Sequence, residues 1–324
     1  MEFTTRNPCV TINNRRKYIP SNSSLSVLDI SVAQAVKADL FCGGKCNGKQ
    51  KILDLENDGL NMAIDGQFLY IRCKRIMYKY NLTDMSLSVQ NVVFKKDGKA
   101  RSFSICGKYI FLVDFCDLYI LHKDDLQIDT IIRIGVDGSS DLGTVMFDEQ
   151  KAYISIRNGN MAVLDMDTKS VRNIAISDSS SWDFCVVKNR IYTGTVNGEL
   201  IETDINNMQL IRRIELCKKN IYSVVHHKGM IYTVSQDMTI KAVNTETFEI
   251  TSVAKKAVKG MTRILGIHNE LLVIADGGIS LWDKQKLKLQ DRFGFPTGHF
   301  NKGVLLHDHM LIGSDFQSVY SCTL

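Results

Sequence analysis

The sequence predicts an all-β protein, a seven-bladed β-propeller of four-stranded antiparallel blades. The first observation is a pattern that repeats seven times, about every 40 residues. Each unit holds a short apolar run, a second run that usually carries tyrosine, a polar turn, and a run ending in an acidic or turn residue. A period of this length with four short strands per unit is typical of propellers. The second observation is that these runs are short and rich in β-branched and aromatic residues, which argues against a helical solenoid.

The strands of each unit are named a, b, c and d from the propeller axis outward. The a strands are expected to begin near Leu60, Ser102, Gly143, Ser181, Ile221, Met261 and Asn301. The b–c turns contain residues that tolerate a positive φ, as in Asn158-Gly159-Asn160 and Asn197-Gly198-Glu199. In such a ring the a–b and c–d turns share one face, and the b–c and d–a turns share the other.

The last unit is one strand short. Residues 301–324 leave room for strands a, b and c only, and an incomplete blade would expose a strand edge. The apolar run 51–55 comes directly before the first a strand, where a d strand belongs. We therefore expect this run to close the last blade. That gives seven blades over residues 51–324 and leaves residues 1–50 as an extension or an irregular eighth blade.

Composition limits the classes of protein. The chain has 324 residues with 44% apolar residues, only three prolines and a net charge of +5, which is too mild for a dedicated nucleic-acid binder. Nine cysteines, an odd number, indicate reduced thiols, and those at 73, 106, 185 and 322 lie in apolar strands and are expected in the core. No apolar stretch is long enough for a signal peptide or a membrane span. We expect a cytoplasmic, monomeric ring.

Two units resemble the WD-repeat family. Segment 232–243 is similar to its b–c hairpin, and segment 278–283 contains the Trp-Asp pair as Trp282-Asp283. The spacing of the repeats in the other units resembles that of divergent WD-repeat and Tyr-Val-Thr-Asn-type propellers. The resemblance implies a protein-interaction platform. It also implies that Asp237, which matches the turn aspartate of the family, orients a hydrogen-bond network inside its blade.

Residues 1–50 allow two interpretations. In the first, segment 17–29 is a b–c hairpin of an eighth blade. In the second, a hairpin over residues 10–20 and a helix near 24–38 precede Cys42 and Cys46, an order that resembles the start of a plant-type ferredoxin and implies an iron–sulfur cluster. Only three residues separate the two cysteines, which departs from ferredoxin spacing. We therefore expect no cofactor.

Five of the seven histidines lie at equivalent a–b turns of three consecutive blades: His226, His227, His268, His307 and His309. Neighbouring imidazoles could bind a transition metal, with His268 and His307 as candidates beside Cys42 and Cys46, or titrate near neutral pH. The alternative is that histidine is simply tolerated in these turns.

The opposite face carries aromatic d–a loops. Trp182 lies in segment 179–184, and Phe295, His299 and Phe300 lie in segment 293–300. Aromatic side chains on loops are typical interface anchors, so these four are the candidate partner-binding residues. The alternative is that they plug the channel or pack between blades. Basic pairs such as Lys218-Lys219 and Lys255-Lys256 occur near d–a connections and could attract an acidic partner, or they are solvated surface.

The predicted function is a non-catalytic interaction scaffold for a protein or peptide. No Gly-x-Ser-x-Gly elbow, phosphate loop or Cys-x-x-Cys pair is present. Two alternatives stay open. One is a propeller enzyme, lactonase- or lyase-like, with a site at the axial mouth. The other is a metal or redox role of the N-terminal cysteines.

Overall fold

The computed structural model describes residues 4–7, 10–11, 50–54, 61–73, 75–84, 86–94, 102–134, 142–148, 150–258, 263–268, 271–275, 278–294, 304–307, 310–314 and 318–323. Side-chain surroundings are described mainly within residues 63–258 and 280–290. All regular structure in the described part of the chain is β-strand. No helix there is long and apolar enough to cross a membrane.

The first four blades follow one another along the chain. The first consists of β4 (Asn61–Asp65), β5 (Phe68–Cys73), β6 (Ile76–Asn81) and β7 (Leu87–Val92). The second consists of β8 (Ser102–Cys106), β9 (Tyr109–Asp114), β10 (Asp117–His122) and β11 (Ile128–Arg133). The third consists of β12 (Leu142–Asp148), β13 (Lys151–Ile156), β14 (Asn160–Asp165) and β15 (Val171–Ala175). The fourth consists of β16 (Ser181–Val187), β17 (Arg190–Thr195), β18 (Glu199–Asp204) and β19 (Leu210–Glu215).

The last three blades complete the ring. The fifth consists of β20 (Ile221–His227), β21 (Met230–Ser235), β22 (Ile240–Asn244) and β23 (Ile250–Ala254). The sixth consists of β24 (Arg263–His268), β25 (Leu271–Ala275), β26 (Gly278–Asp283) and β27 (Leu289–Gly294). The seventh consists of β28 (Val304–His307), β29 (Met310–Ser314), β30 (Ser318–Thr323) and β3 (Gln50–Asp54).

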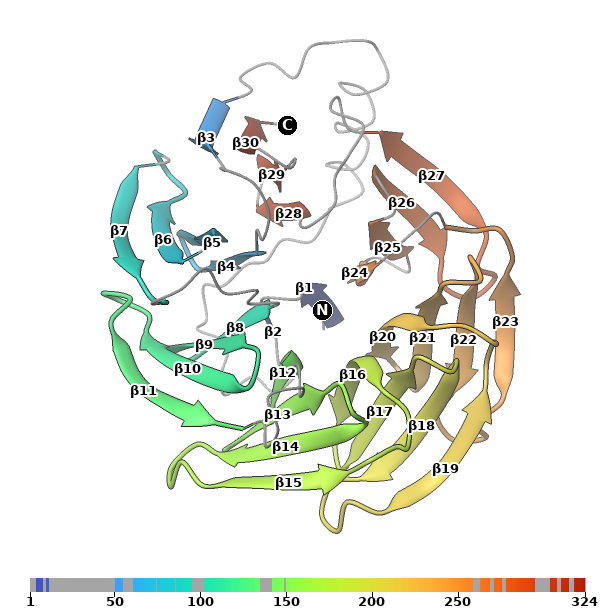
Figure 1. The fold of residues 1–324 in the computed structure, drawn as a ribbon. Coiled ribbons are helices and arrows are strands. Elements are labelled where there is room, and N and C mark those ends of the chain that lie inside the picture. The colour runs from blue at the N-terminus through green and yellow to red at the C-terminus, as the bar shows by residue number, and fades with distance from the viewer. Residues whose placement is uncertain are drawn as a thin grey trace.

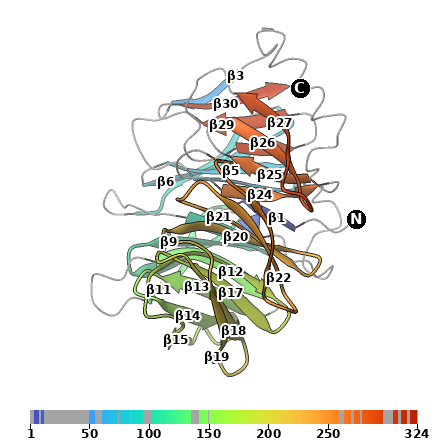
Figure 2. The same ribbon diagram turned by 90° about the vertical axis from the view of Figure 1, so that its right-hand side faces the viewer.

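The blades stand around a central axis, with the a strand of each innermost and the d strand outermost (Figure 1). All strand pairs within the blades are antiparallel, and each pair is formed by strands that are consecutive in the sequence. The exception to this order is the closing strand β3, which pairs with β30 at the other end of the chain. Figure 2 shows the same ring from the side. The predicted all-β, seven-bladed propeller is confirmed.

The closing strand is also confirmed. β3 pairs antiparallel with β30, in a register that sets Gln50 opposite Ser321 and Asp54 opposite Ser318. The chain therefore supplies the outermost strand of its last blade from a segment that precedes its first blade. This pairing covers the edge that β30 would otherwise expose.

Two short strands near the N-terminus lie inside the ring (Figure 1). β1 (Thr4–Asn7) pairs with the innermost strand of the sixth blade, β24, and β2 (Val10–Thr11) pairs with that of the second, β8. The two strands also pair with each other, which joins these blades into one ten-stranded sheet. The hairpin expected over residues 10–20 and the helix near 24–38 involve residues 12–49, which lie outside the described part.

The acidic or amide residue that ends the c strand of the third, fourth, fifth and sixth blades has a local role. The side-chain oxygens of Asp165, Asp204, Asn244 and Asp283 accept hydrogen bonds from backbone N–H groups two and three residues later. Such side-chain-to-backbone bonds set the c–d turn without help from the rest of the fold. Four residues after each of these positions the backbone has a positive φ, at Lys169, Met208, Phe248 and Leu287.

Glycine is required in the b–c turn of the fourth blade. Gly198 has φ +85°, and a Cβ there would lie 2.0 Å from the carbonyl O of Cys217. The turn packs against the d–a connection, with the N–H groups of Leu216 and Cys217 donating to the Gly198 carbonyl. The Asn-Gly pairs therefore mark close contact between two loops as well as a tight turn.

The core lies between blades, where facing sheets pack their apolar side chains together. One cluster joins Phe111 and Val113 of the second blade to Phe147 and Ile154 of the third. Among the described cysteines, 73, 106, 116, 185 and 217 are free thiols. Cys185 is buried as expected, whereas Cys73 and Cys106 are only partly buried. Burial raises the pKa of the Cys106 thiol to about 11.

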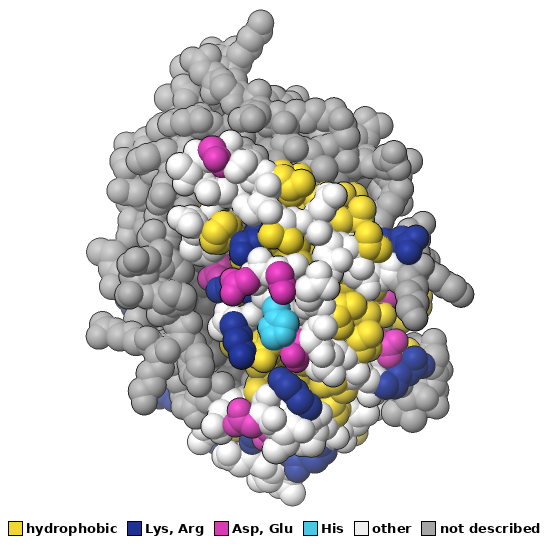
Figure 3. Space-filling model, turned by 90° about the vertical axis from the view of Figure 1, so that its left-hand side faces the viewer, with side chains coloured by type: hydrophobic (Ala, Val, Ile, Leu, Met, Phe, Trp, Pro, Cys, Tyr) yellow, Lys and Arg dark blue, Asp and Glu magenta, His cyan; other side chains and the backbone are white. Residues whose placement is uncertain are grey.

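The outer rim exposes isolated apolar residues. Leu87, Val92, Ile128 and Ile131 of β7 and β11 are 46%, 57%, 38% and 51% exposed. On the side of the ring drawn in Figure 3, hydrophobic groups are small and alternate with charged and polar side chains. Scattered apolar residues of this kind are normal on a soluble surface.

Candidate functional site

The described innermost strands of four blades contain a β-bulge near their b–c end. The a–b pairing slips by one residue in β12, β16, β20 and β24. A bulge adds one residue without a cross-strand partner and changes the direction of its side chain. The bulges give Trp182 and Tyr222 equivalent positions in β16 and β20. Both residues therefore lie on innermost strands, at the face of the b–c turns.

Trp182 is the centre of a group contributed by three consecutive blades. The Cζ of Arg157, from the b–c turn of the third blade, lies 4.3 Å from the centroid of the indole ring. The ring of Tyr222, from the fifth blade, packs edge-on with its centroid 6.4 Å away. All three side chains are partly exposed. We refer to Arg157, Trp182 and Tyr222 as the mouth cluster. It combines a cation–π contact with an aromatic pair.

Polar groups lie next to the mouth cluster. Asp183 is 7% exposed and accepts a hydrogen bond of 2.9 Å from the Val224 N–H of the next blade. The indole Nε1 of Trp182 and the Oγ of Ser179 are shielded from solvent and have no hydrogen-bond partner among the described residues. An indole N–H can only donate. The cluster therefore holds a buried donor that lacks an acceptor.

The structure corrects the placement of Trp182. The residue was expected in a d–a loop, but it belongs to β16, because the strand begins at Ser181 and continues through the bulge. The other three candidate partner-binding residues, Phe295, His299 and Phe300, lie outside the described part of the chain. That these residues bind a partner stays a prediction.

Asp237 lies in the b–c turn of the fifth blade. Its Oδ1 accepts hydrogen bonds from the Ser235 hydroxyl at 2.5 Å, the Thr239 hydroxyl at 2.7 Å and the Thr239 N–H at 3.1 Å. Its Oδ2 lies 3.3 Å from the buried Lys241 Nζ. Burial alone would raise the pKa of this carboxyl, but these hydrogen bonds and the Lys241 charge hold the pKa below its usual value. The contacts form a network within one blade.

The described histidines are engaged in local contacts. His226 Nε2 accepts a hydrogen bond from the Gly229 N–H, and burial together with the Lys188 charge lowers the pKa of His226 to about 4. This imidazole is therefore neutral near pH 7, which corrects the idea that it titrates there. His227 Nε2 lies 3.3 Å from the buried Lys284 Nζ.

The metal candidates are not tested by these contacts. His268 and His307 lie at the ends of β24 and β28, where side-chain surroundings are not described, and Cys42, Cys46 and His309 lie outside the described residues. Among the residues whose side chains are described, no group of three His, Cys, Asp or Glu side chains could hold a metal ion.

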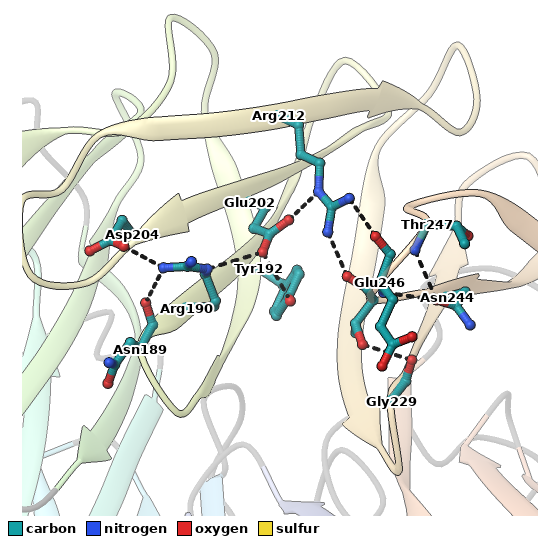
Figure 4. Close-up of polar contacts among 11 residues, drawn as sticks. Asn189, Arg190, Tyr192, Glu202, Asp204, Arg212, Gly229, Asn244, Glu246 and Thr247 are labelled. Atoms are coloured by element: carbon teal, nitrogen blue, oxygen red, sulfur yellow. Dashed lines mark hydrogen bonds and ion pairs between the residues drawn. The ribbon is translucent and has the colours of Figure 1, made fainter.

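A second polar group lies at the opposite face, where the fourth and fifth blades meet (Figure 4). The Glu202 carboxylate is 4% exposed and accepts hydrogen bonds from the Arg212 Nε at 2.5 Å and the Tyr192 hydroxyl at 3.2 Å. It also forms an ion pair with the Arg190 Nε at 3.3 Å. Arg190 also pairs with Asp204. We refer to Arg190, Tyr192, Glu202, Asp204 and Arg212 as the carboxylate network.

The carboxylate network connects two blades. Arg212 donates from its Nη1 to the Glu246 carbonyl at 2.8 Å and from its Nη2 to the Thr245 carbonyl at 2.5 Å, both in the c–d turn of the fifth blade. Burial, followed by the charge and hydrogen bond of Glu202, raises the pKa of Tyr192. Both carboxylate oxygens of Glu202 are occupied by protein donors. The network is therefore suited to stabilising the contact between blades and not to binding a ligand.

Two members of the mouth cluster, Arg157 and Tyr222, were not predicted. A comparison of equivalent positions could have indicated them. Val196 and Gln236 occupy the position of Arg157 in the next two blades, and Gly143 occupies that of Trp182 in the third blade. Positions that vary in this way between otherwise regular units are candidates for function. Their contact across blades, however, depends on the bulges, which have no clear sequence signal.

No protein-family model and no curated protein matches this sequence. Solved structures match in fold. The computationally designed Ika8 protein aligns over 85% of this chain and 100% of its own, with TM-score 0.61 and 13% identity. A chain of the mitotic checkpoint complex aligns over 85% and 90%, with TM-score 0.70 and 12% identity. The β-propeller domain of Cps50 (Swd1) from Myceliophteria thermophila aligns over 85% and 99%, with TM-score 0.64 and 10% identity. At these identities the similarity shows the fold alone, a β-propeller.

Proposed function

We propose that this propeller is a non-catalytic scaffold that binds a protein or peptide partner on the face of the b–c and d–a turns. The observation that carries the proposal is the mouth cluster. Three consecutive blades bring one arginine and two large aromatic side chains together, all partly exposed, at the face of the b–c turns. Tryptophan, tyrosine and arginine are the residues most enriched in binding hot spots.

The composition of the mouth favours binding over catalysis. General acid–base chemistry requires a titratable side chain positioned to exchange a proton with a substrate. The carboxylate nearest the cluster in sequence, that of Asp183, is already hydrogen-bonded to the Val224 N–H of the next blade. The proposal extends to a cytoplasmic location and a monomeric ring, as expected from the sequence.

The proposal can be tested by partner capture. Immobilised wild-type protein and the Trp182→Ala variant are exposed to a lysate of the native cell, and bound proteins are quantified by mass spectrometry. We expect specific partners to be captured at least several-fold less by the variant, with an unchanged circular dichroism spectrum. The matched control is Trp282→Phe, which alters a buried tryptophan of the sixth blade. Equal capture by Trp182→Ala and wild type would refute the proposal.

A further inference from the structure

The mouth cluster places a positive charge beside two aromatic rings. The Cζ of Arg157 lies 4.3 Å from the centroid of the Trp182 ring, so a cation–π contact holds the guanidinium beside the indole. The planar donors of a guanidinium match the two oxygens of a carboxylate. The first requirement for a carboxylate site, a positioned cation, is therefore present at the mouth.

Two further donors lie close by in the chain. The Trp182 Nε1–H and the Ser179 hydroxyl are buried and have no acceptor among the described residues. A buried donor without an acceptor is destabilising, so an acceptor that reached it would recover this loss. The b–c turn that carries Arg157 also packs against the connection that carries Ser179, since a Cβ at Gly159 would lie 2.8 Å from the Ser179 carbonyl O. The unpaired donors therefore belong to the same region as Arg157.

The loops around the cluster have the same charge preference. The d–a connections after the fourth and fifth blades expose the pairs Lys218-Lys219 and Lys255-Lys256. Lys218 is 88% exposed at its side chain and pairs with Glu215, while the connection after the third blade contributes one exposed acid, Asp178. Positive charge therefore predominates in these three connections, which favours the approach of acidic segments.

We propose that the mouth cluster binds an acidic side chain of an extended peptide segment, with the carboxylate held by Arg157 and the adjoining aliphatic part against Trp182 and Tyr222. This inference rests on the proposed scaffold function and specifies the chemistry of the partner. In this inference Arg157 selects ligands that carry a negative charge, and Trp182 provides the apolar contact surface.

The test uses fluorescence anisotropy with the full chain. The probe is a labelled peptide in which glutamate alternates with glycine, compared with peptides in which glutamine or lysine replaces glutamate. We expect the glutamate peptide alone to bind, with an affinity that falls as salt is raised. Arg157→Gln should weaken binding about tenfold or more, as expected for loss of a charge-assisted hydrogen bond. The matched control is Arg172→Gln, on the exposed outer strand of the same blade, which should leave binding unchanged.

Several results would overturn the inference. These are equal binding of the glutamate and glutamine peptides, no binding of the glutamate peptide, or unchanged binding by Arg157→Gln. Displacement of the peptide by inorganic phosphate at equal concentration would also overturn it, because the cluster would then be a site for free anions. If these results accompany loss of partner capture by Trp182→Ala, the scaffold function stands and only the acidic preference fails. If Trp182→Ala captures partners normally, the scaffold function itself fails.

Discussion

Replacing Glu202 with glutamine is expected to destabilise the ring by about 2–3 kcal/mol. The substitution keeps the shape and one acceptor oxygen but removes the charge that two guanidinium groups share. Removing one partner of a buried ion pair costs about 3–5 kcal/mol. The smaller value applies here because the side chains of Arg190 and Arg212 are 38% and 34% exposed and can regain water when the carboxylate is lost.

Urea unfolding followed by circular dichroism measures this loss. The dependence of the unfolding free energy on urea concentration should be the same for variant and wild type before their midpoints are compared. Glu199→Gln is the matched control. Glu199 lies on the same strand, β18, and its ion pair with Arg213 spans 3.7 Å between side chains that are 23% and 47% exposed. Exposed pairs contribute little, so this control should lose less than about 0.5 kcal/mol. Equal losses for the two variants would show that the carboxylate network does not stabilise the ring.

Three further predictions concern the architecture and its pH dependence. Asp237→Ala should lower the free energy of unfolding by about 1–3 kcal/mol through the lost turn and network bonds, and a change below about 0.3 kcal/mol in urea unfolding would count against the WD-repeat analogy. Deleting residues 1–56 should remove β3, expose the edge of β30 and abolish cooperative folding, so a cooperative melt near the wild-type temperature would contradict closure. His226 has a folded pKa of about 4, below its unfolded value, so its contribution to stability is present above about pH 6.5 and is lost as the pH falls toward 4. His226→Gln should reduce this acid sensitivity by up to about 3 kcal/mol, and parallel stability–pH curves for variant and wild type would refute the assignment.

The ring could be predicted from sequence because its information is local and repeated. The Asp or Asn at the end of a c strand fixes a turn through bonds to its own neighbours, as Asp204 does with the N–H groups of Asn206 and Asn207. The same arrangement recurs at Asp165, Asn244 and Asp283. The closing strand could be predicted because a missing strand at one end of the chain matched a spare strand at the other. Both inferences need only the count and order of elements.

The contacts between blades could not be predicted in this way. Arg157 and Tyr222 are 65 residues apart in sequence, and they meet Trp182 because bulges in β16 and β20 place Trp182 and Tyr222 at equivalent positions of neighbouring blades. Arg212 bonds both to Glu202 of its own blade and to the Thr245 carbonyl of the next blade. These partners cannot be identified without knowing that the c–d turns of the two blades are adjacent. The pairing of β1 and β2 with blades on opposite sides of the axis likewise depends on the closed ring.

The carboxylate network and the mouth cluster differ in how much the fold depends on them. The carboxylate network is centred on the buried and fully paired Glu202 carboxylate and joins the fourth blade to the fifth, so its loss should appear as instability. The mouth cluster is partly exposed, holds a donor without an acceptor, and occupies positions where the neighbouring blades have glycine, valine or glutamine. The propeller does not require arginine or tryptophan there, because units with other residues at those positions form equally regular blades. Substitutions at the mouth should therefore change binding with little effect on folding, and substitutions in the network should do the reverse. That contrast would separate the proposed binding site from a structural contact within the same ring.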